Sequence, residues 1–549
     1  MILSKNVAQG HARLSVTLSE MYEDASSPQQ TTSLASGDPL VLWSKDALGI
    51  VIQYTAVGIL LHSISYLGQA FFGSYLQVDP TLVQTYAVIV GFGWYLKVFF
   101  GVISDCFPLM GYRRKSYMIL GWAITFVCMV VMAAIPVGDP YCRDTSLCQI
   151  PQDSLTSDEL QSAFNFNAPS KGSPFIVLTL LLSFGYVMTV CASDALVLQY
   201  ARREPIEIRG RTQCLAYGVR EFSGAFAVVL VGVFLNGPSY QGSFSFEIKP
   251  NAMYGILCVP SGIALFNSIF LINEARSDNV PPRIYFQGLW ELVQKRVTWQ
   301  LCLFLMVVNL FSNFNAGPAF QAASVWANVS AWNYISLAIA SSIVWSFAVF
   351  SVGRWGLQWN WRWLIGIAVL LSITLEALAT LLIIWDRTRN EWIFTALLLF
   401  DSIPIALQFT VSFFCGAEIS DIGNEGAVYG LLMTIQNIMP PFTNVFNSWL
   451  SSCFRADIST DNSHARSQVT TLFAISCSIR LLSLLALFLL PPQKRAVQNL
   501  KRYGGSNTLA AAIVIAAVFA CFAFAILANL LSIFPSTSCL WIAGGSGCP

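Results

Sequence analysis

Charged side chains are scarce in this sequence of 549 residues: Asp, Glu, Lys and Arg make up 11% of it, whereas hydrophobic residues make up 55%. The mean hydropathy is +0.61. A water-soluble protein cannot bury so much apolar surface in its core, which excludes a soluble globule. The formal net charge of +1 provides no basic surface for nucleic acid, so no nucleic-acid partner is expected.

Histidine is also scarce, with three scattered residues, and the 14 cysteines include no CxxC pair and no Cys/His spacing typical of a metal site. The sequence contains no serine–histidine pair and no glycine-rich nucleotide-binding loop. These absences argue against a polytopic membrane enzyme and against ATP as the driving force. We therefore expect no catalytic residue, no metal and no cofactor.

The hydrophobic residues are gathered into continuous runs of about 20 residues, the length that a helix needs to cross a bilayer. Twelve runs lie between residues 47 and 490, and a thirteenth follows near the C-terminus. They cover residues 49–74, 83–104, 116–136, 174–199, 212–236, 253–273, 298–316, 334–352, 363–385, 392–415, 428–450, 469–490 and 509–534. The sequence predicts an all-α, multi-pass protein of the plasma membrane or an organelle membrane.

The spacing of these runs predicts two six-helix bundles with a substrate path between them. We expect a disordered cytoplasmic tail without a cleavable signal peptide over residues 1–46, bundles over 47–273 and 298–491, and a cytoplasmic loop over 274–297 between them. A basic cytoplasmic linker (492–508), an accessory transmembrane helix (509–534) and a short tail (535–549) would follow. The accessory helix is interpreted as an anchor outside the substrate path.

The distribution of basic residues orients the chain with its N-terminus in the cytoplasm. Of the 30 Lys and Arg residues, 20 then lie in cytoplasmic segments, seven on the opposite side and three within spans. Cys142 and Cys148 share a long outer loop, where they can form a disulfide if that side is oxidising or remain free. The same alternative holds for Cys539 and Cys548.

Seven ionisable residues fall inside predicted spans: Lys97, Asp194, Arg220, Glu221, Glu376, Asp401 and Arg480. Each costs about 2.5–3.5 kcal/mol at the centre of a span, so each must be paired, hydrated or functional. The first four lie at similar depth in the inner half of the first bundle, where Lys/Asp and Arg/Glu pairs are expected. The other three lie near the middle of the second bundle.

If every buried cation pairs with an acid, one acid is left over, and it can bind and release a proton during transport. Asp401 is our first choice for this group and Asp194 the second. Both a structural role in ion pairs and direct binding of substrate or protons remain open for all seven residues.

A short loop joins the second and third spans within GWYLKVFFGVISDCFPLMGYRRKSYMILG, residues 93–121. A Gly-x-x-x-Asp sequence ending at Asp105 is followed by the basic cluster that begins with Arg113 and Arg114. This pattern resembles the loop between the second and third helices of major facilitator transporters. We interpret these three residues as gating residues at the cytoplasmic surface.

Four blocks together resemble the folate-biopterin transporter family: LKVFFGVISDCFPLMGYRRKSY, ASDALVLQYARREP, RGRTQCLAYGVREFSG and the segment from Asn424 to Tyr429. The resemblance implies the major facilitator fold and proton-driven uptake of folates, reduced pterins or related metabolites. It carries over to Lys97, Asp105, Arg113, Arg114, Asp194, Arg220 and Glu425, the last of which joins the gating set. Val98 and Gln199 stand where relatives often have Pro and Glu, so the substrate stays open.

Two functions from different classes are compatible with these features. The first is a monomeric secondary transporter, with membrane lipid around it and protons as coupling ions. Asp194 or Asp401 can accept hydrogen bonds from a pterin ring, and Arg220 or Arg480 can hold folate carboxylates. Aromatic residues such as Trp94, Tyr95, Phe314 and Trp345 can stack on the ring. The second function is a receptor or scaffold that keeps the fold without transporting.

Overall fold

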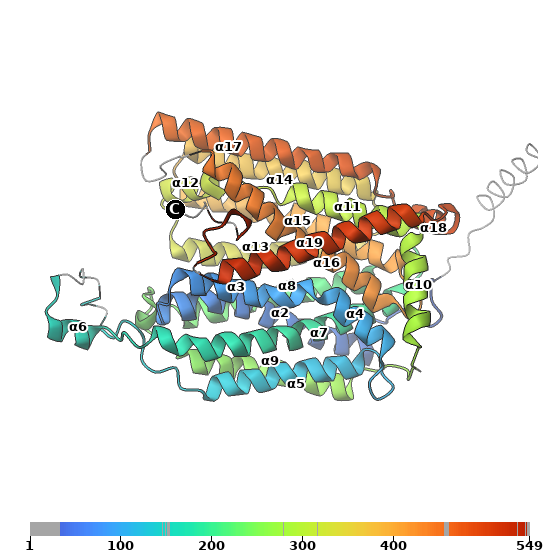
Figure 1. Cartoon of the computed structure of the whole chain (residues 1–549), viewed down its shortest axis with the longest axis horizontal. Helices are drawn as coiled ribbons and strands as arrows, with labels where there is room; N and C mark the ends of the chain where they lie inside the picture. Colours follow the sequence, from blue (N-terminus) through green and yellow to red (C-terminus); the bar gives the residue numbers. More distant parts are fainter. Residues whose placement is uncertain are drawn as a thin grey trace, which may run out of the picture.

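The computed structural model describes residues 33–545 except residues 145, 149, 151–153, 278, 316, 455–460, 535 and 544. Across this part of the chain the backbone forms helices, loops and isolated β-bridges, and no strand. Most helices run nearly parallel in two groups, with α2–α9 below and α11–α17 above in the view of Figure 1. This is the arrangement of two packed helical halves.

The first half contains the six spans predicted before residue 273. Its helices are α2 (Lys45–Leu67) with the π-helix η1 (Gly68–Tyr75), α3 (Pro80–Tyr95), α4 (Lys97–Cys106), α5 (Lys115–Ala134), α6 (Ser157–Ala163), η3 (Pro169–Gly172), α7 (Ser173–Arg203), α8 (Arg211–Phe234), η4 (Pro238–Tyr240) and α9 (Pro250–Phe270). The second predicted span is interrupted at Leu96, between α3 and α4. This interruption places Lys97 at the start of a new helix.

The second half and the C-terminal segment follow α9. Their helices are α10 (Pro282–Gln294), α11 (Arg296–Ser312), α12 (Gly317–Trp326), α13 (Ala331–Ser351) with η5 (Val352–Gly356), α14 (Trp361–Ile384), α15 (Glu391–Ile419), α16 (Glu425–Ser452), α17 (Ser463–Leu481) with η6 (Leu482–Phe488), α18 (Lys494–Tyr503), α19 (Thr508–Ile533) and η7 (Trp541–Ala543). Polar caps begin several of them; the Asn390 side chain, for example, accepts a hydrogen bond from Trp392 N at the start of α15.

Eleven helices among the described residues are long and apolar enough to cross a membrane, or twelve if α11 and α12 form one bent span. The chain is therefore an integral, multi-pass membrane protein. The predicted seventh span, residues 298–316, corresponds to α11, which ends at Ser312, and the separate helix α12 follows to Trp326.

Three segments predicted to be irregular contain ordered structure. The central loop holds α10, and the basic linker holds α18. Residues 33–44 of the predicted tail also pack on the protein, since Leu34 N donates to Arg202 O at 2.8 Å and Leu40 is buried. Residues 1–32 lie outside the described residues.

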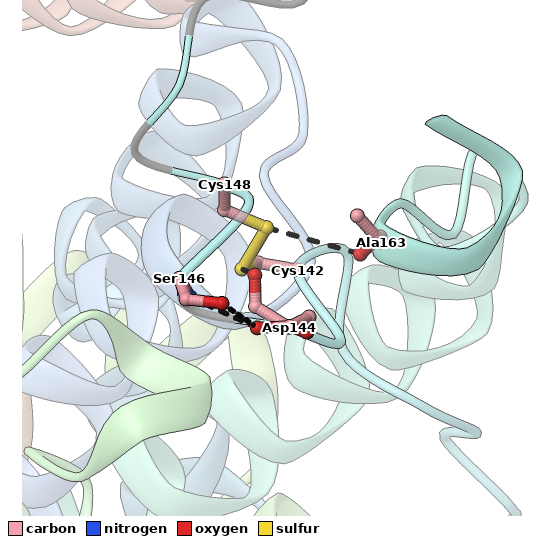
Figure 2. The surroundings of a disulfide bond; sticks show 5 residues. All are labelled: Cys142, Asp144, Ser146, Cys148 and Ala163. Atoms are coloured by element: carbon pink, nitrogen blue, oxygen red, sulfur yellow. Dashed lines mark hydrogen bonds between the residues drawn. A yellow bond between two sulfur atoms is a disulfide. The ribbon is translucent and has the colours of Figure 1, made fainter. Parts of the chain in front are cut away.

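The loop between α5 and α7, predicted to lie on the outer side, contains a disulfide between Cys142 and Cys148, with Cα atoms 6.1 Å apart (Figure 2). Of the two alternatives left open for these cysteines, the structure shows the bonded one. The loop lies at the opposite end of the molecule from α10 and α18 (Figure 1). Cys548, the proposed partner of Cys539, lies outside the described residues.

The two halves meet along two pairs of helices, α4 with α16 and α8 with α13. A Cβ atom on Gly101 of α4 would lie 2.2 Å from the carbonyl oxygen of Gly426 at the start of α16, so the two backbones are in direct contact. In the second pair, Ser346 Oγ donates to Gly218 O at 2.6 Å. α19 packs against both α3 and α16, and so crosses the seam between the halves.

Candidate functional site

An ion-pair cluster joins the two halves at the ends predicted to face the cytoplasm. Arg114, at the start of α5, forms an ion pair with Asp105 at the end of α4 and another with Glu425 at the start of α16, the latter at 3.3 Å. Glu425 also binds Arg202 of α7 at 3.3 Å. All four side chains are at most 5% exposed. We call Asp105, Arg114, Arg202 and Glu425 the inner gate cluster, after the gating role predicted for three of them.

Backbone groups of the second half complete this cluster. Asp105 accepts hydrogen bonds from Ala427 N at 2.7 Å and Gly426 N at 3.3 Å, so a carboxylate of one half caps a helix of the other. Tyr285 Oη of α10 donates to Asp105 at 3.0 Å. Three of the four predicted gating residues are thus brought together. Arg113 is not in the cluster; its backbone N–H donates to Glu274 at 3.1 Å.

A second ion pair between the halves lies beside the first. Arg209, in the loop before α8, binds both carboxylate oxygens of Glu418 at the end of α15, at 3.0 and 3.1 Å. Both side chains are at most 2% exposed. The sequence alone did not predict this pair, because Arg209 stands among the loop charges that set the orientation of the chain. Its place in the block RGRTQCLAYGVREFSG was the available signal.

Lys97 and Asp194 form the Lys/Asp pair expected in the first half. Their charged atoms lie 2.5 Å apart, and both side chains are at most 3% exposed. The other oxygen of Asp194 accepts hydrogen bonds from Tyr54 at 2.6 Å and Tyr217 at 2.9 Å. Tyr217 Oη also contacts Tyr429 Oη of the second half. The buried ion pair is therefore linked to the seam between the halves by tyrosines.

The expected Arg/Glu pair is also present. Arg220 and Glu221 are 2.7 Å apart on α8, and Glu221 additionally contacts His62 Nε2 of α2 at 3.1 Å. The Arg220 guanidinium stacks over the Tyr217 ring, with 4.8 Å between the guanidinium carbon and the ring centroid. His62 and the tyrosines could not be predicted as site residues, since a single histidine or tyrosine in an apolar span carries no spacing pattern.

The three charged residues of the second half line a cavity of about 360 Å³. Arg480 of α17 forms an ion pair with Glu376 of α14 and donates to Ser372 Oγ at 2.9 Å. Asp401 of α15 lines the same cavity, and its Oδ1 is buried without a hydrogen-bond partner among the described residues. Asp401 was the first choice for the acid left over when every buried cation is paired, and its role in binding a proton stays a prediction.

The remaining lining of the cavity combines aromatic, amide, hydroxyl and aliphatic side chains. It consists of the rings Phe304, Phe314 and Phe409, the amides Asn309, Asn313, Asn315, Gln408 and Gln436, the serines Ser312, Ser372 and Ser412, and Val308, Ile365, Val369 and Ile405. Phe409 separates the cavity from the charges of the first half. Its ring centroid lies 5.1 Å from that of Tyr217 and 5.4 Å from the Arg220 guanidinium.

The aromatic residues suggested from the sequence are spread over several places. Phe314 lines the cavity, and Trp345 packs on Phe409 with 5.5 Å between ring centroids. The ring centroid of Trp94 lies 5.1 Å from the Lys97 ammonium nitrogen. Tyr95 Oη accepts a hydrogen bond from the Asn529 side chain of α19. Among the described residues, no group of His, Cys, Asp and Glu is arranged to hold a metal ion.

Sequence comparisons connect this arrangement with known transporters. Residues 57–148 match the model of the BT1 family. The chain is 22% identical over 418 residues to a folate-biopterin transporter of Synechocystis sp., covering 72% of each chain. It is 21% identical over 271 residues to probable folate-biopterin transporter 6 of Arabidopsis thaliana (45% of this chain, 44% of the relative). Folate transporter 1 of Plasmodium falciparum is 22% identical over 201 residues (36% and 32%).

Structural comparisons show the fold. A D-xylose-proton symporter aligns with a TM-score of 0.51 at 13% identity, covering 82% of this chain and 99% of the symporter. The human organic anion transporter MFSD10 aligns with a TM-score of 0.50 at 13% identity, covering 81% and 98%. These matches confirm the resemblance seen in the sequence: the chain is a multi-pass membrane protein with the major facilitator fold, related to the folate-biopterin transporters.

Proposed function

We propose that this membrane transporter carries a pterin, a folate or a related small polar metabolite by alternating access, coupled to protons. The observation that carries the proposal is the cavity of the second half, in which Asp401 Oδ1 is buried with no hydrogen-bond partner in the described part of the chain. The names of the sequence relatives, which include folate-biopterin transporters and a folate transporter, support this substrate class.

The lining of the cavity suits a planar ring with hydrogen-bond donors on its edge. Its volume of about 360 Å³ lies within the range of small-molecule sites. The Asp401 carboxylate can accept hydrogen bonds from the amino and ring N–H groups of a pterin, while Phe314 and Phe409 offer faces for stacking. Because two acids face one arginine here, we expect the pterin ring to occupy this cavity and the carboxylates of a folate to point elsewhere.

Proton coupling follows from the charge of Asp401. A proton on Asp401 removes a buried negative charge, and the neutral carboxyl group still accepts a hydrogen bond from a ligand N–H while its own O–H can donate to a ring nitrogen or carbonyl, so proton binding and ligand binding favour each other at this residue. Arg480 forms its ion pair with Glu376 and donates to Ser372, and no ion pair of Asp401 is present among the described residues. Asp401 is therefore the residue of choice for coupling, and Asp194, which is paired with Lys97, is the second choice.

Alternating access requires that the ion pairs between the halves break when the cytoplasmic side opens. Asp105, Glu425 and Glu418 each bind groups of the opposite half and are almost fully buried. Opening would return these charges to water, which compensates in part for the lost pairs. Such pairs can hold a closed state without making it permanent.

The test is uptake of labelled biopterin and labelled folate into proteoliposomes at acidic and at neutral outside pH. Asp401→Asn should abolish the dependence of uptake on pH, because the amide cannot take up the proton. Asp158→Asn, which alters an exposed acid of the outer loop, is the matched control and should behave as the wild type. Full pH dependence in Asp401→Asn would remove this residue from coupling.

The receptor or scaffold hypothesis has its own outcome in the same experiment. Folded protein that binds biopterin and transports neither compound would favour it. Absence of both binding and uptake would direct the search to other small polar metabolites.

A further inference from the structure

The cytoplasmic helix α18 has the composition of a solvated, basic segment, with four cations in ten residues. It lies at the cytoplasmic end of the molecule together with α10, between the twelfth span and α19 (Figure 1). Yet Lys494 and Val497 on one face of α18 are at most 1% exposed. A lysine whose only purpose is to mark the cytoplasmic side would stay in water, so this burial has another cause.

The buried face of α18 contacts both residues of the Arg209–Glu418 pair. Lys494 Nζ donates to Arg209 O at 2.6 Å, which is a contact with the first half. Gln498 Nε2 donates to Glu418 Oε2 at 2.6 Å and to Glu418 O at 3.0 Å, which are contacts with the second half. One face of a helix outside both bundles thus holds each partner of an ion pair that joins them.

Further contacts fix the rest of α18 to the second half. Lys501 Nζ binds Asp421 at 2.7 Å and donates to Ser420 O at 3.1 Å. Burial lowers the pKa of Lys494 to about 8, against the raising effect of Glu418. Burial of an ammonium group is unfavourable unless its hydrogen bonds compensate. The hydrogen bond from Lys494 to Arg209 therefore compensates for the burial of the ammonium group.

The segment after α18 continues the connection along the seam. Arg296 N donates to Gly505 O at 3.0 Å, and Asn507 N donates to Gln294 O at 2.9 Å, which ties the start of α19 to the α10–α11 corner. Farther along α19, Phe522 packs on Phe99 of the first half, with ring centroids 5.5 Å apart. On the other side Phe524 packs on Phe442 of the second half, at 4.9 Å.

We propose that α18 and α19 form a clamp on the inner gate, by which we mean the inner gate cluster together with the neighbouring Arg209–Glu418 pair. In this clamp Lys494 and Gln498 are positioning residues that hold Arg209 and Glu418 together. The clamp favours the closed cytoplasmic side and must release whenever that side opens. It acts on the gate whichever substrate the protein carries. α19 is then a working part of the transport cycle and more than an anchor.

Cys214 of α8 provides a native reporter for this proposal. Its side chain is 1% exposed, and a Cβ on Gly353 of η5 would lie 2.7 Å from its Cβ, so the thiol is covered by the second half. Separation of the inner ends would expose it to N-ethylmaleimide. The alkylation rate of the exposed Cys453 checks that the reagent is active. The alkylation rate of Cys302, which is buried in α11, detects general unfolding.

The experiment compares alkylation rates of the full-length protein in lipid nanodiscs, resolved by peptide mass spectrometry. Lys494→Met and Gln498→Leu should each raise the Cys214 rate about tenfold, the effect expected for loss of a hydrogen bond that involves a charged group, and leave Cys302 unchanged. Lys494→Arg, which keeps a cationic donor, should restore the slow rate. Arg495→Met removes an exposed charge from the same helix and should have no effect.

A double variant separates positioning from mere packing. If Gln498 acts through Glu418, the effects of Gln498→Leu and Glu418→Gln on the Cys214 rate should be strongly non-additive. Additive effects, or Cys214 rates within twofold of wild type in both folded single variants, would overturn the clamp. A parallel rise at Cys302 in either variant would assign the effect to unfolding and would equally count against it.

Discussion

Replacement of Glu425 by Gln should weaken the inner gate cluster without changing its shape. The Glu425 carboxylate lies 3.3 Å from nitrogens of both Arg114 and Arg202. At an effective dielectric constant of about 20, each pair has a gross attraction of about 5 kcal/mol, most of which is offset by the desolvation of buried charges. Removing one partner of a buried pair costs about 3–5 kcal/mol. Since glutamine keeps one acceptor oxygen, we expect the lower value, about 3 kcal/mol.

A loss of about 3 kcal/mol corresponds to a shift of roughly 100-fold in the ratio of closed to open protein. Cys106, which adjoins Asp105 and is 1% exposed, reports this shift through its alkylation rate from the cytoplasmic side. Glu207→Gln, a change at an exposed acid of the same surface, is the matched control. A rate in Glu425→Gln within threefold of wild type, in folded protein, would show that these ion pairs do not hold the gate.

Three further predictions concern other charged and sulfur groups. Lys97→Met should strongly lower the midpoint temperature of thermal unfolding, because it leaves the Asp194 carboxylate buried without its cation. Adding Asp194→Leu to this variant should recover part of the lost stability. A further, additive loss in the double variant would refute the pairing. Mass spectrometry after alkylation without reductant should find Cys142 and Cys148 unmodified, and reductant should expose both; free thiols before reduction would contradict the disulfide. The pKa of Lys494 in the closed, clamped state is about 8, below its ordinary value of 10.5. Lys494 therefore binds its proton more tightly after release from the clamp. Raising the pH from 8 towards 10 removes this proton and should favour the closed gate. Spin-label distances between the inner ends of the halves should show this shift in wild type and not in Lys494→Met.

Much of the fold could be predicted because hydropathy acts locally along the chain. Each long apolar run must become a helix in the bilayer, whatever its neighbours are. Short helices such as α10 and α18 escaped prediction because neither is long or apolar enough to stand out beside the spans. Their structure depends on contacts with the cytoplasmic ends of both halves.

The candidate site could be predicted where membrane depth limits the possible partners. Lys97 and Asp194 lie at similar depth in spans of one bundle, so a pair was expected and is present. Arg209 and Lys494 could not be assigned in this way. A basic residue at the predicted cytoplasmic surface looks the same in sequence whether its side chain is solvated or buried in an ion pair. The partner of Arg209, Glu418, is 209 residues away in the sequence.

The central claim is that this protein moves a pterin or folate across the membrane at the expense of a proton gradient. The most direct measurement is the ratio of inside to outside labelled biopterin in proteoliposomes with an acidic exterior. We predict accumulation above the outside concentration, which collapses when a protonophore is added. Equilibration without accumulation would contradict proton coupling, and binding without entry in folded protein would contradict transport itself.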